Sequence, residues 1–194
     1  MNKKQLKALA DFAPVVRDKK RPALNGIFVN FEDGVAVATD GKALVELTLD
    51  ELRVSGAGKH IIPIASVKDA LKVVKGKFSI KPGNIGGIAY TPMDLPYVGY
   101  ENAIPENKAP GVLPWCDPYF LAKFEKFREA FKAEWSVALP ETLLGAVKFN
   151  LFYLNSDSEL GYDPEDQKAT IVIMPKRGVL SNHKEYCTAG KRKA

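Results

Sequence analysis

The sequence predicts an α+β fold built from units that each combine a helix with antiparallel strands, and three observations support that prediction. Between residues 21 and 49, two Asp-Gly pairs separate three runs rich in β-branched and aromatic residues. Three other segments place apolar side chains at helical intervals. Short runs of strand character accompany each of these segments, and the pattern recurs about every sixty residues. The chain is therefore expected to contain the same structural unit three times.

The segment with the clearest pattern is 21–49, RPALNGIFVNFEDGVAVATDGKALVELTL. Strands are predicted over Ile27–Phe31, Val35–Ala38 and Ala43–Leu49, joined at Asp33-Gly34 and Asp40-Gly41. Asp-Gly suits a tight hairpin because Gly adopts positive φ without steric cost and Asp tolerates it better than most residues. On pattern alone, this segment is an antiparallel meander without a specific function.

The remainder of the first two units follows in order. A helix is predicted over Asn2–Phe12 and is ended by Pro14. Further along, the prediction is a strand at 60–64, a helix at 66–74 capped by Ser66, and strands at 77–81 and 85–90. Residues 94–105, DLPYVGYENAIP, are expected to be extended.

The third unit is predicted to begin after a linker at 106–110 and a strand at 111–115. Asp117 is placed to cap a helix that starts with Pro118 and runs to about Lys132. Helical spacing assigns four aromatic side chains of this helix to the core: Phe120, Phe124, Phe127 and Phe131. Strands are expected at 135–139, 147–154 and 169–174, with an acidic loop at 156–168.

Composition is ordinary for a globular protein, with 46% hydrophobic and 26% charged residues. No apolar run is long enough to span a bilayer, and the N-terminal segment lacks the apolar core and cleavage site of a signal peptide. A cytoplasmic protein without membrane contact is therefore expected. The two cysteines and two histidines form no metal-binding motif, so neither a metal nor another cofactor is predicted.

Catalytic motifs are missing from the sequence, and an enzyme is not expected. There is no GxSxG, and residues 56–60, GAGKH, lack the first Gly and the Ser or Thr of a phosphate-binding loop. Asp40 could be imagined as a catalytic carboxylate, but its place in a turn explains it more simply.

Positive charge is concentrated on the predicted helices. The net charge is +5, and the lysines of each helix lie away from its apolar face, as expected of a protein that faces a polyanion. For any single lysine, the alternative is a solubilising surface residue. Nine lysines are candidate contacts to such a polyanion: Lys3, Lys4, Lys7, Lys68, Lys72, Lys75, Lys123, Lys126 and Lys132.

Several motifs resemble the bacterial sliding clamp family, the β subunit of DNA polymerase III. RPALNGI and ATDGKAL are similar to the opening of the family's middle domain, while PIASVKDALKVVKGK and LPYVGYENAIPENK are similar to its second helix and closing segment. WCDPYFLAKFEKF and ATIVIMPKR resemble a helix and the final strand of the family's last domain. The resemblance covers roughly residues 5–177 in order and implies the DNA-clamp fold.

The resemblance leaves the family's first domain unmatched, and the expectation is a reduced clamp like those of phages or mobile elements. The resemblance implies a full clamp domain at 1–106, similar to the middle domain, and a half domain at 111–177, similar to the C-terminal half of the last domain. A basic tail at 178–194 follows. Closing a ring from such chains would require several copies, so a homo-oligomer is expected.

In the family, a hydrophobic pocket binds short peptide motifs of polymerases and repair proteins. The resemblance places this partner-peptide pocket at one turn and one strand end of the present chain: Thr39, Asp40, Gly41, Leu44, Met174, Pro175 and Arg177. Lys42, Ala43 and Lys176 stand where the family usually has His, Arg and Met. The pocket floor is thus kept while its rim is altered.

The function implied by the resemblance is a DNA sliding clamp, a polymerase processivity factor that encircles duplex DNA without reading its sequence. Its contacts would be to phosphates, which lets the ring diffuse along DNA while its topology prevents dissociation. Its partners would be double-stranded DNA, a DNA polymerase, other clamp-binding peptides and a clamp loader. The alternative is a non-encircling, clamp-like adaptor or decoy that binds replication proteins or the host clamp. Solution mass separates the two, since a monomer favours the adaptor.

Overall fold

The computed structural model describes residues 1–14, 17–105, 117–138, 146–153 and 167–174. Within these ranges the helices are α1 (Lys3–Ala10), α2 (Ile64–Val73) and α3 (Pro118–Phe131). The strands of the main sheet are β1 (Gly26–Asn30), β2 (Val35–Thr39), β3 (Ala43–Thr48), β4 (Lys59–Pro63), β8 (Ala133–Ala138), β9 (Val147–Tyr153) and β10 (Gln167–Ile173). A small second sheet contains β5 (Ile80–Lys81), β6 (Asn84–Ile85) and β7 (Ile88–Ala89).

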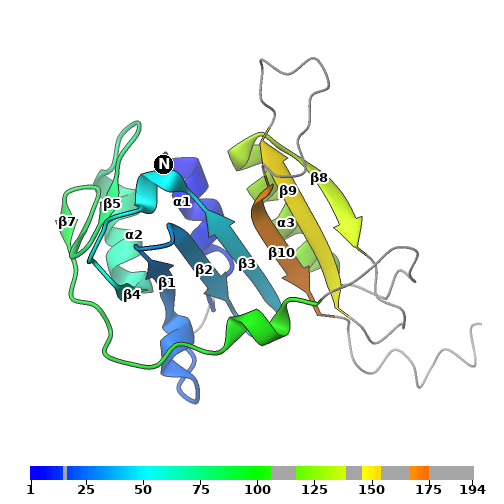
Figure 1. The fold of residues 1–194 in the computed structure, drawn as a ribbon, viewed down its shortest axis with the longest axis horizontal. Helices are drawn as coiled ribbons and strands as arrows, with labels where there is room; N and C mark the ends of the chain where they lie inside the picture. The colour runs from blue at the N-terminus through cyan, green and yellow to red at the C-terminus, as the bar shows by residue number, and fades with distance from the viewer. Residues whose placement is uncertain (15–16, 106–116, 139–145, 154–166, 175–194) are drawn as a thin grey trace, which may run out of the picture.

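The seven strands of the main sheet lie in the order β4-β1-β2-β3-β10-β9-β8, and every neighbouring pair is antiparallel (Figure 1). The meander β1-β2-β3 forms as predicted, with register pairs Val29↔Ala36 and Ala38↔Val45. The C-terminal strand β10 pairs with β3, where Ile171 faces Val45 across the ladder. This one pairing joins the N-terminal and C-terminal parts of the chain into a single sheet.

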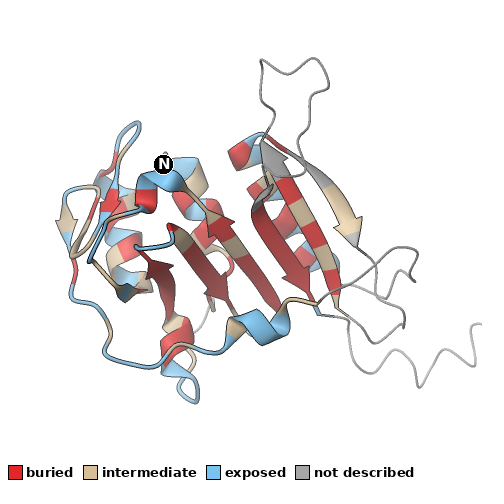
Figure 2. Ribbon diagram, viewed as in Figure 1, coloured by how far each residue is buried: buried red, intermediate tan, exposed pale blue. Residues whose placement is uncertain are grey.

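Side chains alternate between the two faces of this sheet, which follows from the two-residue period of a strand. In β2, Ala36 and Ala38 belong to the main core with the helices, whereas Val37 belongs to a smaller cluster on the opposite face. Figure 1 shows the helices behind the sheet. Residues 91–104, here called the strap, cover the smaller cluster through side chains such as Tyr97 and Tyr100. The central strands are consequently buried on both faces (Figure 2).

Helix α3 matches its prediction closely. The side chain of Asp117 accepts a hydrogen bond of 3.0 Å from the backbone N–H of Tyr119, and Pro118 is the first helical residue. The four predicted phenylalanines are buried, among them Phe127, whose ring meets the ring of Phe12 edge-on at 5.9 Å. The helix ends at Phe131, and the C-cap residue Lys132 has a left-handed backbone with φ of 51°.

The other two helices differ in how they begin. Asn2 and Gln5 form a reciprocal capping box at the start of α1, so this helix begins one residue later than predicted. The prediction that Ser66 caps α2 is wrong. This helix already starts at Ile64, and its N-cap residue is Pro63, whose side chain has no polar atom to accept a capping hydrogen bond.

The remaining predicted strands form with boundaries shifted by a few residues, except in the region after α2. Predicted strands 77–81 and 85–90 are reduced to the two-residue strands β5, β6 and β7. Gly86 and Gly87, which have positive φ, interrupt the second of these predicted strands. The linker at 106–110, the strand at 111–115, most of the loop at 156–168 and the tail at 178–194 lie outside the described residues. None of the helices that the structure describes is long and apolar enough to cross a membrane.

Candidate functional site

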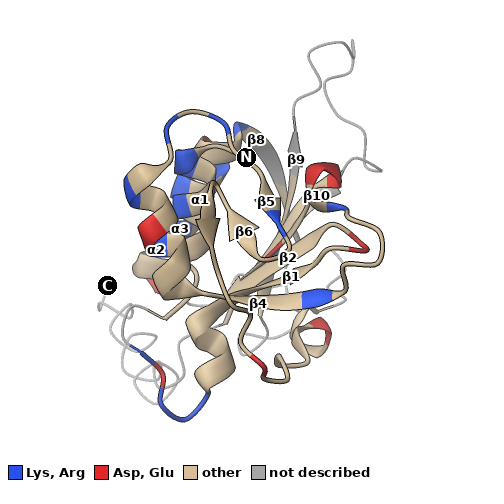
Figure 3. Ribbon diagram, turned by 90° about the vertical axis from the view of Figure 1, so that its left-hand side faces the viewer, with Lys and Arg blue, Asp and Glu red and all other residues tan. Residues whose placement is uncertain are grey.

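A groove of about 540 Å³ lies where α1, α2 and α3 meet on the helix side of the sheet. Its floor is largely apolar and includes Ala10, Ile64, Leu71 and Ala122. The exposed ring of Tyr119 also lines it. Figure 3 shows the basic residues of α1, α2 and α3 in blue on this side of the molecule.

Four of the nine predicted DNA-contacting lysines line this groove with their side chains exposed: Lys3, Lys7, Lys68 and Lys126. They come from all three helices, so the fold gathers charges that lie far apart in the sequence. The single carboxylate among the lining residues is Asp11, which Lys7 binds at 2.7 and 3.0 Å. The groove therefore has an apolar floor and a cationic rim.

Four further predicted lysines are exposed but do not line the groove: Lys4, Lys72, Lys75 and Lys132. Lys72 forms an ion pair with Asp69 at 2.8 Å, three residues earlier on α2. These residues belong to the same helices or their ends, and they extend the positive surface beyond the groove.

Lys123 corrects the prediction that places it on the exposed face of α3. Its side chain is only 6% exposed, and its ammonium binds the carboxylate of Asp40 at 2.9 Å. The ammonium also lies 4.8 Å from the ring centre of Tyr119 and 5.4 Å from that of Phe120. Lys123 therefore borders the groove with an ammonium that is already paired with Asp40, which is a structural role.

A second, smaller pocket of about 190 Å³ lies on the strap side of the sheet. It is lined by four of the residues predicted for the partner-peptide pocket, namely Thr39, Gly41, Leu44 and Met174. Thr39 and Gly41 come from the β2–β3 turn, while Met174 follows β10. The β3–β10 pairing brings these distant segments together, and the backbone N–H of Met174 donates to the carbonyl of Lys42 at 2.9 Å. Pro175 and Arg177 lie outside the described residues.

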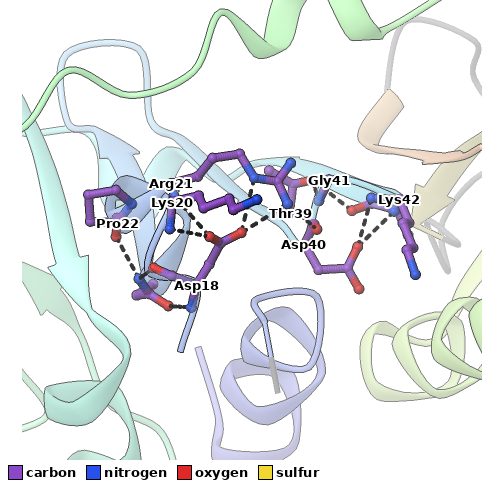
Figure 4. Close-up of polar contacts among 10 residues, drawn as sticks. Asp18, Lys20, Arg21, Pro22, Thr39, Asp40, Gly41 and Lys42 are labelled. Carbon is purple, nitrogen blue, oxygen red and sulfur yellow. Dashed lines mark hydrogen bonds and ion pairs between the residues drawn. The ribbon is translucent and has the colours of Figure 1, made fainter. Parts of the chain in front are cut away.

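The β2–β3 turn owes its shape to Asp40 and Thr39 (Figure 4). One carboxylate oxygen of Asp40 accepts hydrogen bonds of 2.9 Å from the backbone N–H groups of both Lys42 and Ala43. The hydroxyl of Thr39 donates to the carbonyl of Ala43 at 2.8 Å and accepts from the N–H of Gly41 at 2.9 Å. The other carboxylate oxygen of Asp40 binds Lys123, so Asp40 does not line the pocket. It links the turn to α3 instead.

Arg21 lies directly over this turn and lines the pocket, which the motif comparison did not predict. Asp18 holds its guanidinium at 2.9 Å (Figure 4). The backbone N–H of Arg21 and then its side chain donate to Asp18, which keeps the pKa of this carboxyl below its ordinary value. Gly41 has φ of +83°, and a Cβ there would overlap a guanidinium nitrogen of Arg21. Glycine at 41 thus permits the arginine to approach.

The strap supplies the opposite wall of the pocket through Val98, Tyr100 and Ala103. Tyr97 stacks on Phe28 of β1 with ring centres 5.0 Å apart, which fastens the strap to the sheet. The hydroxyl of Tyr100 bonds the carboxylate of Glu46 on β3. Burial is the main reason that the pKa of Glu46 is raised, and burial likewise raises the pKa of Tyr100. The tyrosines of 94–105 were the one sign in the sequence that this segment packs against the sheet. The residues that they contact lie far away in the sequence, so the pocket wall was not predicted.

In the part of the chain that the structure describes, no three His, Cys, Asp or Glu side chains are grouped so that they could hold a metal ion. The two surfaces described above are therefore the candidate sites, and they occupy opposite faces of one sheet.

No protein-family profile and no curated protein sequence matches the chain. Solved structures do. The DNA polymerase III subunit beta from Pseudomonas aeruginosa matches with a TM-score of 0.62 and 14% identity over 91% of this chain. The DNA polymerase sliding clamp from Bacillus subtilis matches with a TM-score of 0.60 and 13% identity over 90%. This chain has the sliding-clamp fold.

A further clamp, from Bartonella birtlesii and bound to griselimycin, matches with a TM-score of 0.51 and 15% identity over 91% of this chain. The matches cover 65%, 62% and 65% of the Pseudomonas, Bacillus and Bartonella chains respectively. The present chain therefore spans somewhat less than two thirds of the length of these clamps. At this identity the likeness concerns the clamp fold, and the two candidate sites must be argued from their own residues.

Proposed function

We propose that this protein is a DNA sliding clamp or clamp-like processivity factor, which surrounds duplex DNA as a homo-oligomer and docks partner peptides. The observation that carries the proposal is the groove formed by three helices on a clamp fold, rimmed by Lys3, Lys68 and Lys126. A non-enzymatic role is consistent with this fold.

The cationic rim supports a sequence-independent contact with DNA. Three helices present exposed ammonium groups to one groove, whereas its single carboxylate, Asp11, is neutralised by Lys7. Ammonium groups on flexible stems attract phosphates without selecting bases, which is what sliding requires. The buried pair of Lys123 and Asp40 fixes α3 relative to the sheet and so holds one part of the rim in place.

The pocket on the strap side supports a peptide-docking role. Leu44, Val172 and Met174 provide an apolar floor, and Met174 and Val98 are 41% and 37% exposed. Exposed apolar side chains around a preformed hollow are typical of a site that buries one or two apolar side chains of a partner. A clamp loader, a polymerase and other clamp-binding peptides are the partners that a processivity factor would need.

Light scattering with and without circular primed DNA tests the ring. A closed oligomer that remains on circular DNA and is lost when the DNA is linearised is the expected result, because topology would then hold the protein. A stable monomer that binds polymerase peptides without being retained on the circle would overturn the clamp and assign the adaptor or decoy role.

Salt dependence tests the groove. The logarithm of the duplex association constant should fall with the logarithm of salt concentration by about 0.9 per neutralised phosphate. In the double variant Lys3→Gln/Lys68→Gln this slope should become shallower by nearly 2 units, estimated from that coefficient. The matched control is Lys59→Gln/Lys81→Gln, which removes the same charge from exposed positions outside the groove. Equal effects of the two variants would contradict a localised DNA contact.

A further inference from the structure

Tyr119 is an exposed aromatic residue inside the cationic groove, and phosphate binding does not require it. Its side chain is 50% exposed at the start of α3, and it lines the same hollow as Lys3, Lys68 and Lys126. Ammonium groups alone would satisfy a duplex backbone. The presence of a ring among them indicates a ligand that combines negative charge with a flat apolar face.

The ring of Tyr119 packs against two neighbouring side chains. The buried ammonium of Lys123 lies 4.8 Å from its centre, and Phe120 contacts it edge-on at 5.3 Å. Lys123 is itself anchored by Asp40 at 2.9 Å. A ring supported by a cation and a neighbouring ring loses little freedom when a ligand covers its exposed surface.

The groove has the size and lining for one unstacked base. Its volume of about 540 Å³ lies within the range of about 300–1,000 Å³ that is typical of small-ligand sites. Ile64 and Leu71 of α2 add apolar surface, and the lysines of the rim can reach the flanking phosphates. Proteins that bind single strands combine a positive groove with aromatic rings on which bases stack.

We propose that this groove binds single-stranded DNA, with one unpaired base stacked on Tyr119 and its adjacent phosphates bound by the lysines of the rim. This inference rests on the proposed function, in which the groove contacts duplex DNA, and it adds single-stranded DNA as a second ligand of the same groove. In an intact duplex the bases are already stacked on one another, so Tyr119 would meet only the sugar-phosphate backbone. A junction between duplex and single strand would use both features of the groove.

Fluorescence anisotropy on the full chain tests this with three labelled probes of equal length. These are oligothymidylate of about 15 nucleotides, near the upper site size of single-strand binders, an abasic oligonucleotide, and a duplex. The abasic probe carries the same phosphates without bases. We expect wild type to bind oligothymidylate more tightly than the abasic strand, and Tyr119→Ala to reduce oligothymidylate binding roughly tenfold while leaving the abasic strand unchanged.

Two further variants of Tyr119 distinguish stacking of a base on the ring from burial of a base against any apolar side chain. Tyr119→Phe should keep the affinity for oligothymidylate because the ring remains, whereas Tyr119→Leu should lose it although the apolar volume is similar. Tyr119→Phe keeps the ring beside Lys123 and should unfold at the same temperature as wild type. Tyr119→Leu loses this cation–π contact, so binding is compared at a temperature where thermal unfolding shows both variants to be folded.

Three outcomes would overturn the inference: no effect of Tyr119→Ala, an equal loss for oligothymidylate and the abasic strand, or preferential binding of poly-glutamate, which would assign an acidic peptide. Unchanged duplex binding in Tyr119→Ala keeps this test separate from that of the clamp. Loss of the proposed function would instead appear as absent duplex binding in wild type.

Discussion

The helix face and the strap face of the sheet are covered in different ways. Against the helices, the sheet packs into a large core in which Phe127 is fully buried and meets Phe12. Against the strap, it packs into a small cluster in which Phe28 is covered mainly by Tyr97 and Tyr100. Most of the packing that stabilises the fold is therefore on the helix face, whereas only the strap covers the sheet around the smaller pocket.

The largest effect is expected from truncating the helix-face core. Phe127→Ala should lower the free energy of unfolding by about 3–5 kcal/mol, because a large, fully buried ring is lost from the main core. Phe28→Ala should cost clearly less, since its cavity opens towards the strap. Urea unfolding of both variants makes the comparison. Equal losses would mean that the two faces contribute alike.

The next effect concerns the pair that connects the two faces. Asp40→Asn keeps acceptors for the turn but leaves the ammonium of Lys123 buried without a counter-charge, which should cost about 3 kcal/mol of unfolding free energy. The double variant Asp40→Asn/Lys123→Met should recover most of this loss, because it removes the unpaired charge. Chemical unfolding measures both. If Asp40→Asn left the free energy of unfolding unchanged, the ammonium of Lys123 would have to be solvated without its partner.

A smaller effect is expected at Gly41. Gly41→Ala should destabilise the fold by about 1–2 kcal/mol because its φ of +83° disfavours a side chain, and it should displace Arg21 from the pocket rim. Gly56→Ala is the matched control, since φ is +71° there and a Cβ would meet nothing within 4 Å. Thermal unfolding should show backbone strain in both variants. Binding of a polymerase-derived peptide should weaken only in Gly41→Ala, where Arg21 is displaced. Equal peptide affinities would exclude a role for Arg21.

The smallest effect concerns the carboxyl that the strap covers. The pKa of Glu46 is raised by burial, so its ionisation disfavours the folded state as pH rises through the folded-state pKa. Glu46→Gln should therefore raise the unfolding temperature at pH 7 and leave it nearly unchanged below the ordinary pKa of a glutamate. Melting curves of Glu46→Gln and wild type at the two pH values test this. A rise in unfolding temperature seen only at acidic pH would contradict the raised pKa of Glu46.

Local patterns predicted the local features of the fold. Asp-Gly pairs and alternating residues located the β1-β2-β3 meander, and Asp117, Pro118 and the phenylalanine spacing defined α3. The same spacing could also have predicted that Lys123 is buried. Lys123 follows Phe120 by three residues and precedes Phe127 by four, which puts it on the buried face of the helix.

The contacts between distant segments had no such local signal. The position of Arg21 over Gly41 depends on Asp18, and the strap wall depends on Tyr97 stacking on a strand nearly seventy residues earlier in the chain. The motif resemblance supplied Thr39, Gly41, Leu44 and Met174 for the pocket, but only the β3–β10 pairing explains why they meet.

The position of β10 between β3 and β9 has a consequence for synthesis on the ribosome. Until residues 167–173 have emerged, β3 has no neighbour on one side, although β1, β2 and β4 are already available to pair. An unpaired apolar edge such as Leu44–Leu47 is a template for pairing with another nascent chain. Completion of the sheet, and with it protection from aggregation, must therefore wait for the last described strand.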